Sequence, residues 1–309
     1  MSLPTVFYGA LAVFAIANLV RVVRMLAMPA HLRWELYPVP HESRAKARYG
    51  GSYFEETDWW TRSMEIHPSG DLRVMLEEIF LLKGVWRHNR TMWIWSWLFH
   101  TGLYLMIGAG ILATTCASAQ HFGAVGACRI VRPLVAILCW TAMTGGTIGT
   151  SGILILRITS PRLRPYTSRW TLINLLVIFL VFATGLLNLL VNPAATDQMV
   201  SFAAELLRFQ AASRLHGLTA AHVLLLALFM AYLPFTQMTH MYMKYFTYHR
   251  VRWDDAPSRP GTRMQASILR SLRRRISWAA PHIRGEGERS WVETVAQEVA
   301  RGEKKPSHR

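Results

Sequence analysis

The stretch that decides the fold is WTLINLLVIFLVFATGLLNLLV, residues 170–191. A helix in the core of a soluble protein needs a polar face that recurs about every 3.6 residues. Between Leu175 and Leu187 the sole polar side chain is that of Thr184. A helix needs about 20 predominantly apolar residues to cross the hydrocarbon core of a bilayer. This segment is therefore predicted to be a transmembrane helix.

Four further stretches have the same character: residues 4–20, 92–115, 133–156 and 216–245. The hydrophobic residues, 52% of the chain, are thus concentrated in five spans. The predicted fold class is all-α, an integral membrane bundle of five transmembrane helices in which helices two to five form a four-helix bundle. The first span lacks the basic leader and the small-residue cleavage site of a signal peptide, so we expect it to remain as a helix.

The distribution of basic residues predicts the topology. A net charge of +16 and a pI near 10.5 would by themselves suggest nucleic-acid binding. However, all but four of the 34 Lys and Arg fall on one side of the predicted spans, and the four exceptions are Arg129, Arg132, Arg208 and Arg214. Basic residues near helix ends stay in the cytoplasm. We therefore expect a bacterial inner-membrane protein with its N-terminus outside, its C-terminus in the cytoplasm and no nucleic-acid partner.

The chain is predicted to have four segments. They are a first transmembrane helix (1–28), a cytoplasmic loop with interfacial segments (29–91), the four-helix transmembrane bundle (92–245) and a basic cytoplasmic tail (246–309). The loop mixes aromatic with basic residues, which is typical of the headgroup layer or of a docked partner. In the tail we predict a basic amphipathic stretch at 268–276 and a short helix at 291–299, with a solvated tail as the alternative.

The three cysteines are divided between a loop and a span. Cys116 and Cys128 flank the predicted outer loop between spans two and three, whereas Cys139 lies inside the membrane. An oxidising exterior would allow a disulfide between the first two. Two unpaired buried thiols are the favoured expectation.

Several cofactor motifs are missing from the sequence. It has no Cys-x-x-Cys and no Cys-x-x-Cys-His, which argues against an iron–sulfur cluster or a covalently attached haem. No P-loop pattern suggests a nucleotide site. The glycines of the third span are interpreted as residues that permit close helix packing, namely Gly145, Gly146, Gly149 and Gly152.

Histidines within a bilayer are costly and normally have a partner, so each is a functional candidate. His100 lies about eight residues, or roughly 12 Å of rise, into the second span, and His240 lies near the same cytoplasmic end of the fifth. The two can face each other and clamp one haem iron between imidazoles. His222 precedes His240 by 18 residues, which in a continuous helix is five turns or about 27 Å, a spacing that suits two stacked haems. Histidines present by chance or for packing are the alternative.

These residues resemble the cytochrome b gamma subunit of respiratory nitrate reductase and its relatives in sulfate-respiration and heterodisulfide-reductase-like complexes. Trp97-Leu-Phe-His100-Thr-Gly is similar to the family's Leu-Phe-His-x-Gly. Ser160-Pro-Arg-Leu-Arg164 is similar to the family's loop between helices three and four, and Leu233-Pro-Phe-Thr-Gln-Met-Thr-His240 to its fifth helix. The resemblance covers residues 92–245 and implies a haem-binding bundle.

The terminal parts resemble one branch of these relatives. Residues 31–42, 49–60 and 277–282 are similar to membrane subunits of transmembrane electron-transfer complexes in sulfate reducers. This resemblance implies a cytoplasmic iron–sulfur partner subunit of heterodisulfide-reductase type. A periplasmic multihaem cytochrome c is a further candidate partner.

Carried over residue by residue, the resemblance implies that His100 and His240 ligate the iron of an inner haem b and His222 that of an outer one. The expected partner of His222, ten residues after His100, falls on Gly110, which cannot ligate iron. The outer haem is therefore expected to be missing, five-coordinate or completed by a substitute, so that the chain holds one or two haems b. The candidate substitutes are His121 and Met106.

Three arginines after the third span are expected to hold haem propionates, because guanidinium binds carboxylate in a bidentate manner. They are Arg162, Arg164 and Arg169, and charge that serves only topology is the alternative reading for each.

Three functions are compatible with the sequence. The leading one is a quinone-linked cytochrome b, the quinone-oxidoreductase subunit of a multisubunit electron-transfer complex, with quinone or quinol as diffusible substrate. The second is a membrane anchor with a structural haem or none. The third is a transporter, because histidines within the membrane and glycine-broken helices also mark ion paths. The two halves of the chain show no convincing repeat, which disfavours the third.

Overall fold

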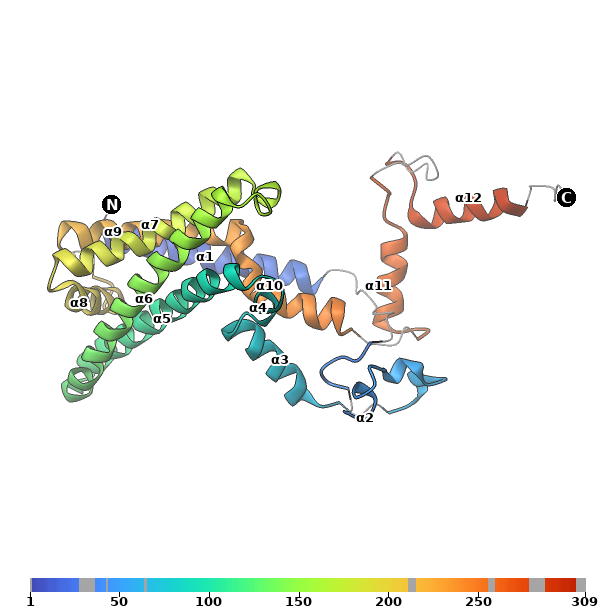
Figure 1. The fold of residues 1–309 in the computed structure, drawn as a ribbon, viewed down its shortest axis with the longest axis horizontal. Coiled ribbons are helices and arrows are strands. Elements are labelled where there is room, and N and C mark those ends of the chain that lie inside the picture. The colour runs from blue at the N-terminus through green and yellow to red at the C-terminus, as the bar shows by residue number, and fades with distance from the viewer. Residues whose placement is uncertain are drawn as a thin grey trace. The chain divides into compact units, whose positions relative to one another are not determined.

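The computed structural model describes residues 2–27, 37–42, 44–63, 66–210, 215–254, 259–277 and 287–303, which are nearly all helical (Figure 1). Five stretches are long and apolar enough to cross a membrane. They are α1 (Leu3–Leu26), α5 (Arg90–His121), α6 (Val125–Thr159), α7 (Arg169–Val191) and Gly217–Phe235, which begins with α9 (Gly217–Tyr232). The predicted all-α fold with five membrane-spanning helices is confirmed.

Shorter elements fill the connections. They are α2 (Arg44–Ala47), α3 (Pro68–Phe80), α4 (Lys83–His88), α8 (Ala195–Leu207), α10 (His240–Thr247), α11 (Arg263–Leu272) and α12 (Trp291–Glu303). Short 3₁₀ turns occur at Tyr53–Glu55, Trp59–Thr61, Arg164–Tyr166, Leu233–Phe235 and Gln237–Thr239, and a π-helical turn at Tyr248–Arg252. The predicted helix at 291–299 is confirmed as α12. The predicted amphipathic stretch starts five residues earlier than expected, as α11.

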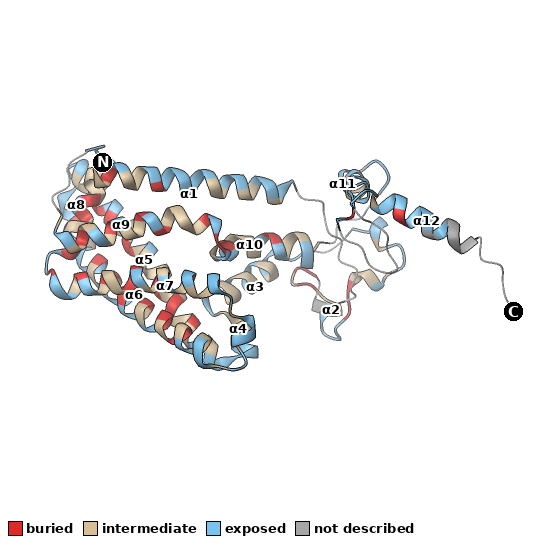
Figure 2. Cartoon of the chain, turned by 90° about the horizontal axis from the view of Figure 1, so that it is seen from above, coloured by how far each residue is buried: buried red, intermediate tan, exposed pale blue. Residues whose placement is uncertain are grey.

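Burial follows the pattern of a membrane bundle (Figure 2). Buried residues line the surfaces where α5, α6, α7, α8 and α9 meet. Outward faces carry large exposed apolar side chains, among them Ile107, Ile111, Ile130, Ile137 and Ile155. Exposed apolar surface on this scale marks contact with a membrane or with partner proteins.

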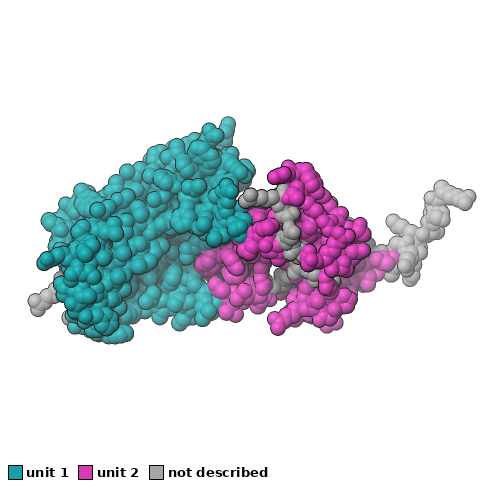
Figure 3. All heavy atoms as spheres, turned by 90° about the horizontal axis from the view of Figure 1, so that it is seen from below, with its two compact units in different colours: residues 1–21, 69–241 teal, residues 22–68, 242–309 magenta. Residues whose placement is uncertain are grey.

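The chain forms two compact units, drawn in teal and magenta in Figure 3. The first comprises residues 1–21 and 69–241, and the second residues 22–68 and 242–309. In the second unit the carboxylate of Glu42 accepts hydrogen bonds from Ser52 Oγ (2.8 Å) and from the backbone N–H of Tyr53 (3.2 Å). All candidate haem ligands lie in the first unit, so its packing is what positions the site.

Glycines allow α5 and α6 to pack backbone against backbone. A Cβ on Gly102 would lie 2.7 Å from the backbone nitrogen of Gly146, and a Cβ on Gly149 would collide with the backbone of Phe99. Helices in lipid have no hydrophobic driving force to associate. Small residues at a crossing let the two backbones come close enough for extensive van der Waals contact. The predicted packing role is confirmed for Gly146 and Gly149, and this crossing fixes the position of the helix that carries His100.

The fifth span is not one continuous helix. α9 ends at Tyr232, two 3₁₀ turns follow, and α10 begins at His240. Pro234 has no N–H to donate to the helix, and Thr236 has an extended backbone (φ −112°, ψ 176°). The expectation that His222 and His240 lie five turns apart on one helical face is therefore wrong, because the turn count does not run through this break.

α8 is a helix that the sequence analysis did not identify. It buries Ala195, Val200 and Phe202 in the first unit. Just before it, Asn192 Nδ2 donates a hydrogen bond to Thr219 Oγ1 (3.0 Å), which donates in turn to Asn188 Oδ1 (3.0 Å). These buried polar groups satisfy one another and join the end of α7 to the start of α9.

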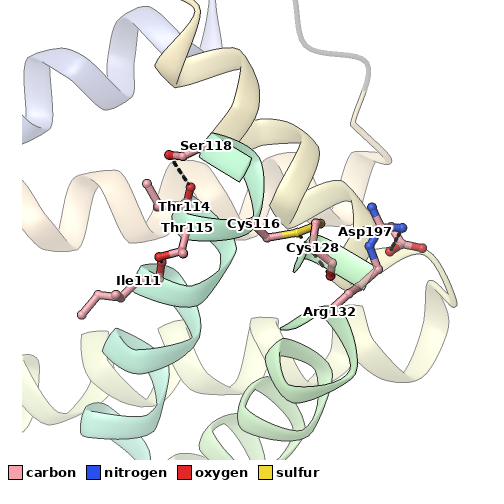
Figure 4. The surroundings of a disulfide bond; sticks show 8 residues. All are labelled: Ile111, Thr114, Thr115, Cys116, Ser118, Cys128, Arg132 and Asp197. Carbon is pink, nitrogen blue, oxygen red and sulfur yellow. Dashed lines mark hydrogen bonds and ion pairs between the residues drawn. A yellow bond between two sulfur atoms is a disulfide. The ribbon is translucent and has the colours of Figure 1, made fainter. Parts of the chain in front are cut away.

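Cys116 and Cys128 form a disulfide between the last turns of α5 and the first turn of α6 (Figure 4). The expectation of two unpaired thiols is therefore wrong. Both spans are longer than predicted, and the short connection between them brings the two cysteines to a Cα–Cα distance of 4.5 Å. Nearby, Arg132 forms an ion pair with Asp197 of α8 (3.0 Å).

Loss of the disulfide is expected to destabilise the protein. A loop of this length contributes about 2–4 kcal/mol to the free energy of unfolding. The Cys128→Ser variant should therefore show a lower thermal denaturation midpoint in detergent, and reductant should lower that of the wild type. Cys139→Ala, which keeps the disulfide, is the control and should retain the response to reductant. Equal midpoints for reduced and oxidised wild type would contradict the prediction.

Candidate functional site

The structure brings together two of the predicted histidine ligands. The ring centroids of His100 and His240 lie 6.1 Å apart, with an angle of 70° between the ring planes. His100 projects from α5 and is half-buried, whereas His240 is the first residue of α10 and is exposed. We call these two residues the histidine pair.

Backbone carbonyl groups fix the tautomer of both rings. His100 Nδ1 lies 2.6 Å from the carbonyl oxygen of Ser96, and His240 Nδ1 lies 3.1 Å from that of Gln237. A carbonyl can only accept, so each Nδ1 carries the proton and donates it. The lone pair that can bind a metal is then on Nε2 in both rings. This outer hydrogen bond is the usual support of a histidine that ligates a metal.

The spacing of the histidine pair suits a single metal ion between the rings. An imidazole nitrogen binds a transition metal at about 2 Å, so two such nitrogens on opposite sides of one ion are about 4 Å apart and the ring centres about 6 Å or slightly more. The observed 6.1 Å between centroids agrees with this. By this spacing, His100 and His240 are the residues that would hold one haem iron.

The segment before His240 is held by the first helix. Arg21 of α1 donates through Nη1 to Thr239 Oγ1 (2.6 Å) and to the carbonyl oxygen of Thr236 (3.4 Å). Thr236 Oγ1 in turn accepts from the backbone N–H of Met238 (3.1 Å). In the sequence, Arg21 is only one of the basic residues that predict topology, because nothing there links residue 21 to residue 239.

His222 faces a hydroxyl group instead of a second histidine. Its Nδ1 lies 3.1 Å from Thr184 Oγ1, and Thr184 Oγ1 lies 2.7 Å from the carbonyl oxygen of Leu180. The hydroxyl thus links the ring of His222 on α9 to the backbone of α7. Thr184 was noted in the sequence as a polar exception in an apolar span, and this hydrogen bond gives it a role.

A cavity of about 210 Å³ lies beside His222. Its wall includes Gly110 of α5, Met143 of α6, Gly185 of α7 and Met199 of α8. A Cβ on Gly110 would meet nothing within 4 Å, so the missing side chain leaves open space there. Apart from His222 and a few amide, hydroxyl and thiol groups, the wall is apolar.

Neither candidate substitute for the missing ligand lies in the wall of this cavity. α5 does continue through His121, but His121 is its last residue, is exposed and packs against the ring of Phe122 (5.1 Å). Met106 packs instead against the hydrophobic cluster around Phe99 and Phe182. The structure thus brings neither of them to His222.

The predicted propionate partners are all exposed: Arg162 and Arg164 lie in the connection between α6 and α7, and Arg169 is the first residue of α7. Arg157, one turn before that connection, was missed. Its Nε atom is buried and has no hydrogen-bond partner in the part of the chain that the structure describes. A buried N–H without an acceptor is costly, so a hydrogen-bond acceptor beside this guanidinium would be favoured. In the sequence, Arg157 looks like any basic residue at the end of a span.

Comparison with known proteins identifies one family. The model of the nitrate reductase gamma subunit family matches residues 86–254, just over half of the chain, and the match includes all three candidate ligands His100, His222 and His240. No curated protein matches the chain, and no solved structure does.

Proposed function

Because the chain belongs to the nitrate reductase gamma subunit family, we propose that it exchanges electrons between the quinone pool and a cytoplasmic iron–sulfur subunit. Nitrate reductase gamma subunits are haem b-containing membrane cytochromes within multisubunit respiratory complexes. The chain is accordingly a multi-pass membrane protein and a cytochrome b. The observation that carries the proposal is the histidine pair, with its centroids 6.1 Å apart.

In this proposal His100 and His240 hold the haem iron through their Nε2 atoms. A bound haem supplies a one-electron redox centre. The carbonyl groups of Ser96 and Gln237 orient the rings and raise the basicity of Nε2. Arg21 fixes the turn that precedes His240, so the pair is positioned by three separate helices.

The proposed partner follows from the resemblance to subunits of sulfate reducers. Residues 49–60 of that resemblance lie in the second unit, where the ring of Trp59 contacts those of Tyr53 and Phe54 (centroids 5.8 and 4.3 Å apart). Residues 31–36 and 278–282 lie outside the described residues. We propose a cytoplasmic iron–sulfur subunit of heterodisulfide-reductase type as the electron partner and a periplasmic multihaem cytochrome c as a further one.

The proposed orientation in the inner membrane has the N-terminus outside and the C-terminus in the cytoplasm. Two observations support it. The excess of basic residues lies on the side of the C-terminal tail. The Cys116–Cys128 disulfide joins the ends of α5 and α6 that lie away from most of the basic residues. Disulfides persist on the oxidising side of a bacterial inner membrane.

Reduction by a quinol separates this function from its alternatives. The purified protein in detergent is mixed with a reduced quinone, and the b-type absorption band is followed. We expect the band of the reduced haem to appear, and to disappear when an added quinone reoxidises the haem. A passive anchor would show a haem band that the quinol does not reduce, and a transporter without haem would show no band. Either of these results would refute the proposed electron exchange.

Arg157 is proposed to pair with a haem propionate, alongside Arg162, Arg164 and Arg169. A cation near the haem favours the reduced state, so Arg157→Gln should lower the midpoint potential. With an effective dielectric constant near 20 the effect at about 10 Å is on the order of 1–2 kcal/mol, or roughly 40–80 mV. Redox titration of the b-type band measures it. Arg129→Gln changes an exposed arginine at the other end of α6 and should leave the potential unchanged. Equal potentials for Arg157→Gln and wild type would contradict the assignment.

A further inference from the structure

We infer that this chain holds a single haem b, at the histidine pair, and that the region around His222 forms an apolar chamber in place of a second haem site. The inference rests on the proposed function, because it takes the histidine pair as the haem ligands. Because Gly110 stands where a ligand is expected, the outer haem could be missing, five-coordinate or completed by a substitute ligand, and the inference selects the first of these.

The described residues that line the cavity beside His222 include no second imidazole. Across the cavity from an imidazole, a haem iron needs an imidazole, thioether or thiolate to complete its coordination. α5 contributes Gly110 to the wall, and His121 and Met106 do not reach it. His121 is also 11 residues beyond Gly110, which is about 16 Å along the helix.

Among the described residues, three sulfur-containing side chains line the cavity. Met199 Sδ and Cys139 Sγ contact each other at 3.6 Å, and Met143 packs over Gly185. A Cβ built on Gly185 would lie within 3.0 Å of both Met143 Sδ and His222 Cε1. The sulfur and the ring therefore converge on one point above the backbone of α7. Met143 thus lies beside the Cε1 edge of the His222 ring, against α7, and we interpret this contact as packing and not as ligation.

The size of the chamber leads to the same conclusion. An apolar cavity of about 150 Å³ holds one benzene ring, and this one measures about 210 Å³. A haem has four pyrrole rings and two propionates. In this structure the chamber has the volume of about one small ring, so a haem would require the side chains around it to rearrange.

Contacts between α8 and α6, and between α5 and α6, oppose expansion of the chamber. α8 contributes Met199 and Phe202 to the wall and is tied to α6 by the Arg132–Asp197 ion pair. Cys139 Sγ contacts Met199 Sδ at 3.6 Å, and the Cys116–Cys128 disulfide closes the end of the α5–α6 hairpin. Outward movement of α8 would break these contacts.

A single haem has a consequence for the path of electrons. With two stacked haems an electron could cross most of the bilayer within this chain. With one haem at the histidine pair, quinone must exchange electrons on that side of the membrane. No electron would then pass through the region around His222.

The haem content of the purified full-length protein tests the inference. A pyridine haemochrome assay combined with amino-acid analysis should give one haem per chain, and a redox titration should fit one single-electron component. Two haems per chain, or two components, would overturn the inference and leave the proposed function standing. A protein purified without haem would refute the proposed function and this inference together.

The His222→Leu variant adds a second readout. The inference expects its haem content and the shape of its absorption band to equal those of the wild type, whereas a ligand role for His222 predicts loss of haem or a change in the band. Thr184→Val, which removes the hydrogen bond to the ring without a change in side-chain size, serves if His222→Leu fails to fold. A changed spectrum in either folded variant would overturn the inference.

Discussion

His100→Leu and His240→Leu are each expected to abolish haem b binding. Each substitution removes one of two axial ligands and leaves an apolar side chain that cannot bind iron. The remaining histidine would hold the haem through a single bond at an exposed edge of the first unit, since His240 is exposed. We expect the b-type band of the purified protein to fall from one equivalent to less than a tenth of that. The measurement is the reduced-minus-oxidised spectrum, normalised to protein.

A matched control separates ligand loss from a general effect of histidine replacement. His121→Leu changes an exposed histidine on the same helix as His100, at its other end. We expect this variant to keep its full haem content. Retention of the band in both His100→Leu and His240→Leu would show that the histidine pair is not the ligand set.

The second large effect is expected at the crossing of α5 and α6. Gly102→Ala places a Cβ 2.7 Å from the backbone nitrogen of Gly146, and backbone cannot move aside as a flexible side chain can. Overpacking of this kind costs about 1–3 kcal/mol. Because α5 carries His100 only two residues away, the displaced helix should also bind haem less tightly. The thermal denaturation midpoint and the retained haem together measure the effect.

Gly110→Ala provides the matched control on the same helix. A Cβ on Gly110 meets nothing within 4 Å. Alanine is favoured over glycine in a helix interior by about 1 kcal/mol, so this variant should be as stable as the wild type or more stable. The two substitutions are chemically identical and are expected to have opposite signs. Equal midpoints for Gly102→Ala and Gly110→Ala would contradict the backbone crossing described here.

The spans could be predicted from the sequence, and their ends and interruptions could not. A run of about 20 apolar residues is a property of composition, which the sequence shows directly. The break between Tyr232 and His240 was missed because proline is tolerated within membrane helices, so Pro234 did not settle the question. α8 was missed because its 13 residues are too few to span a bilayer and lie in a segment read as a loop.

The histidine pair could be proposed from depth alone, since the position of each residue along its span places it relative to the membrane surface. The contacts that support the pair depend on tertiary structure. Arg21 reaches Thr239 across 218 positions of sequence, and Thr184 reaches His222 across 38. The buried Nε of Arg157 likewise becomes visible only once neighbouring helices cover it. The candidate ligands can therefore be predicted from the sequence, whereas the residues that position them are identified only from the packing of the helices.

Electron paramagnetic resonance of the oxidised, purified wild-type protein reports which ligands bind the haem iron. Two imidazole ligands impose a strong field, so we expect one low-spin ferric haem signal, and this signal should be lost in His100→Leu and kept in His222→Leu. A wild-type spectrum dominated by high-spin ferric haem, or a low-spin signal that survives the loss of His100, would contradict ligation by His100 and His240.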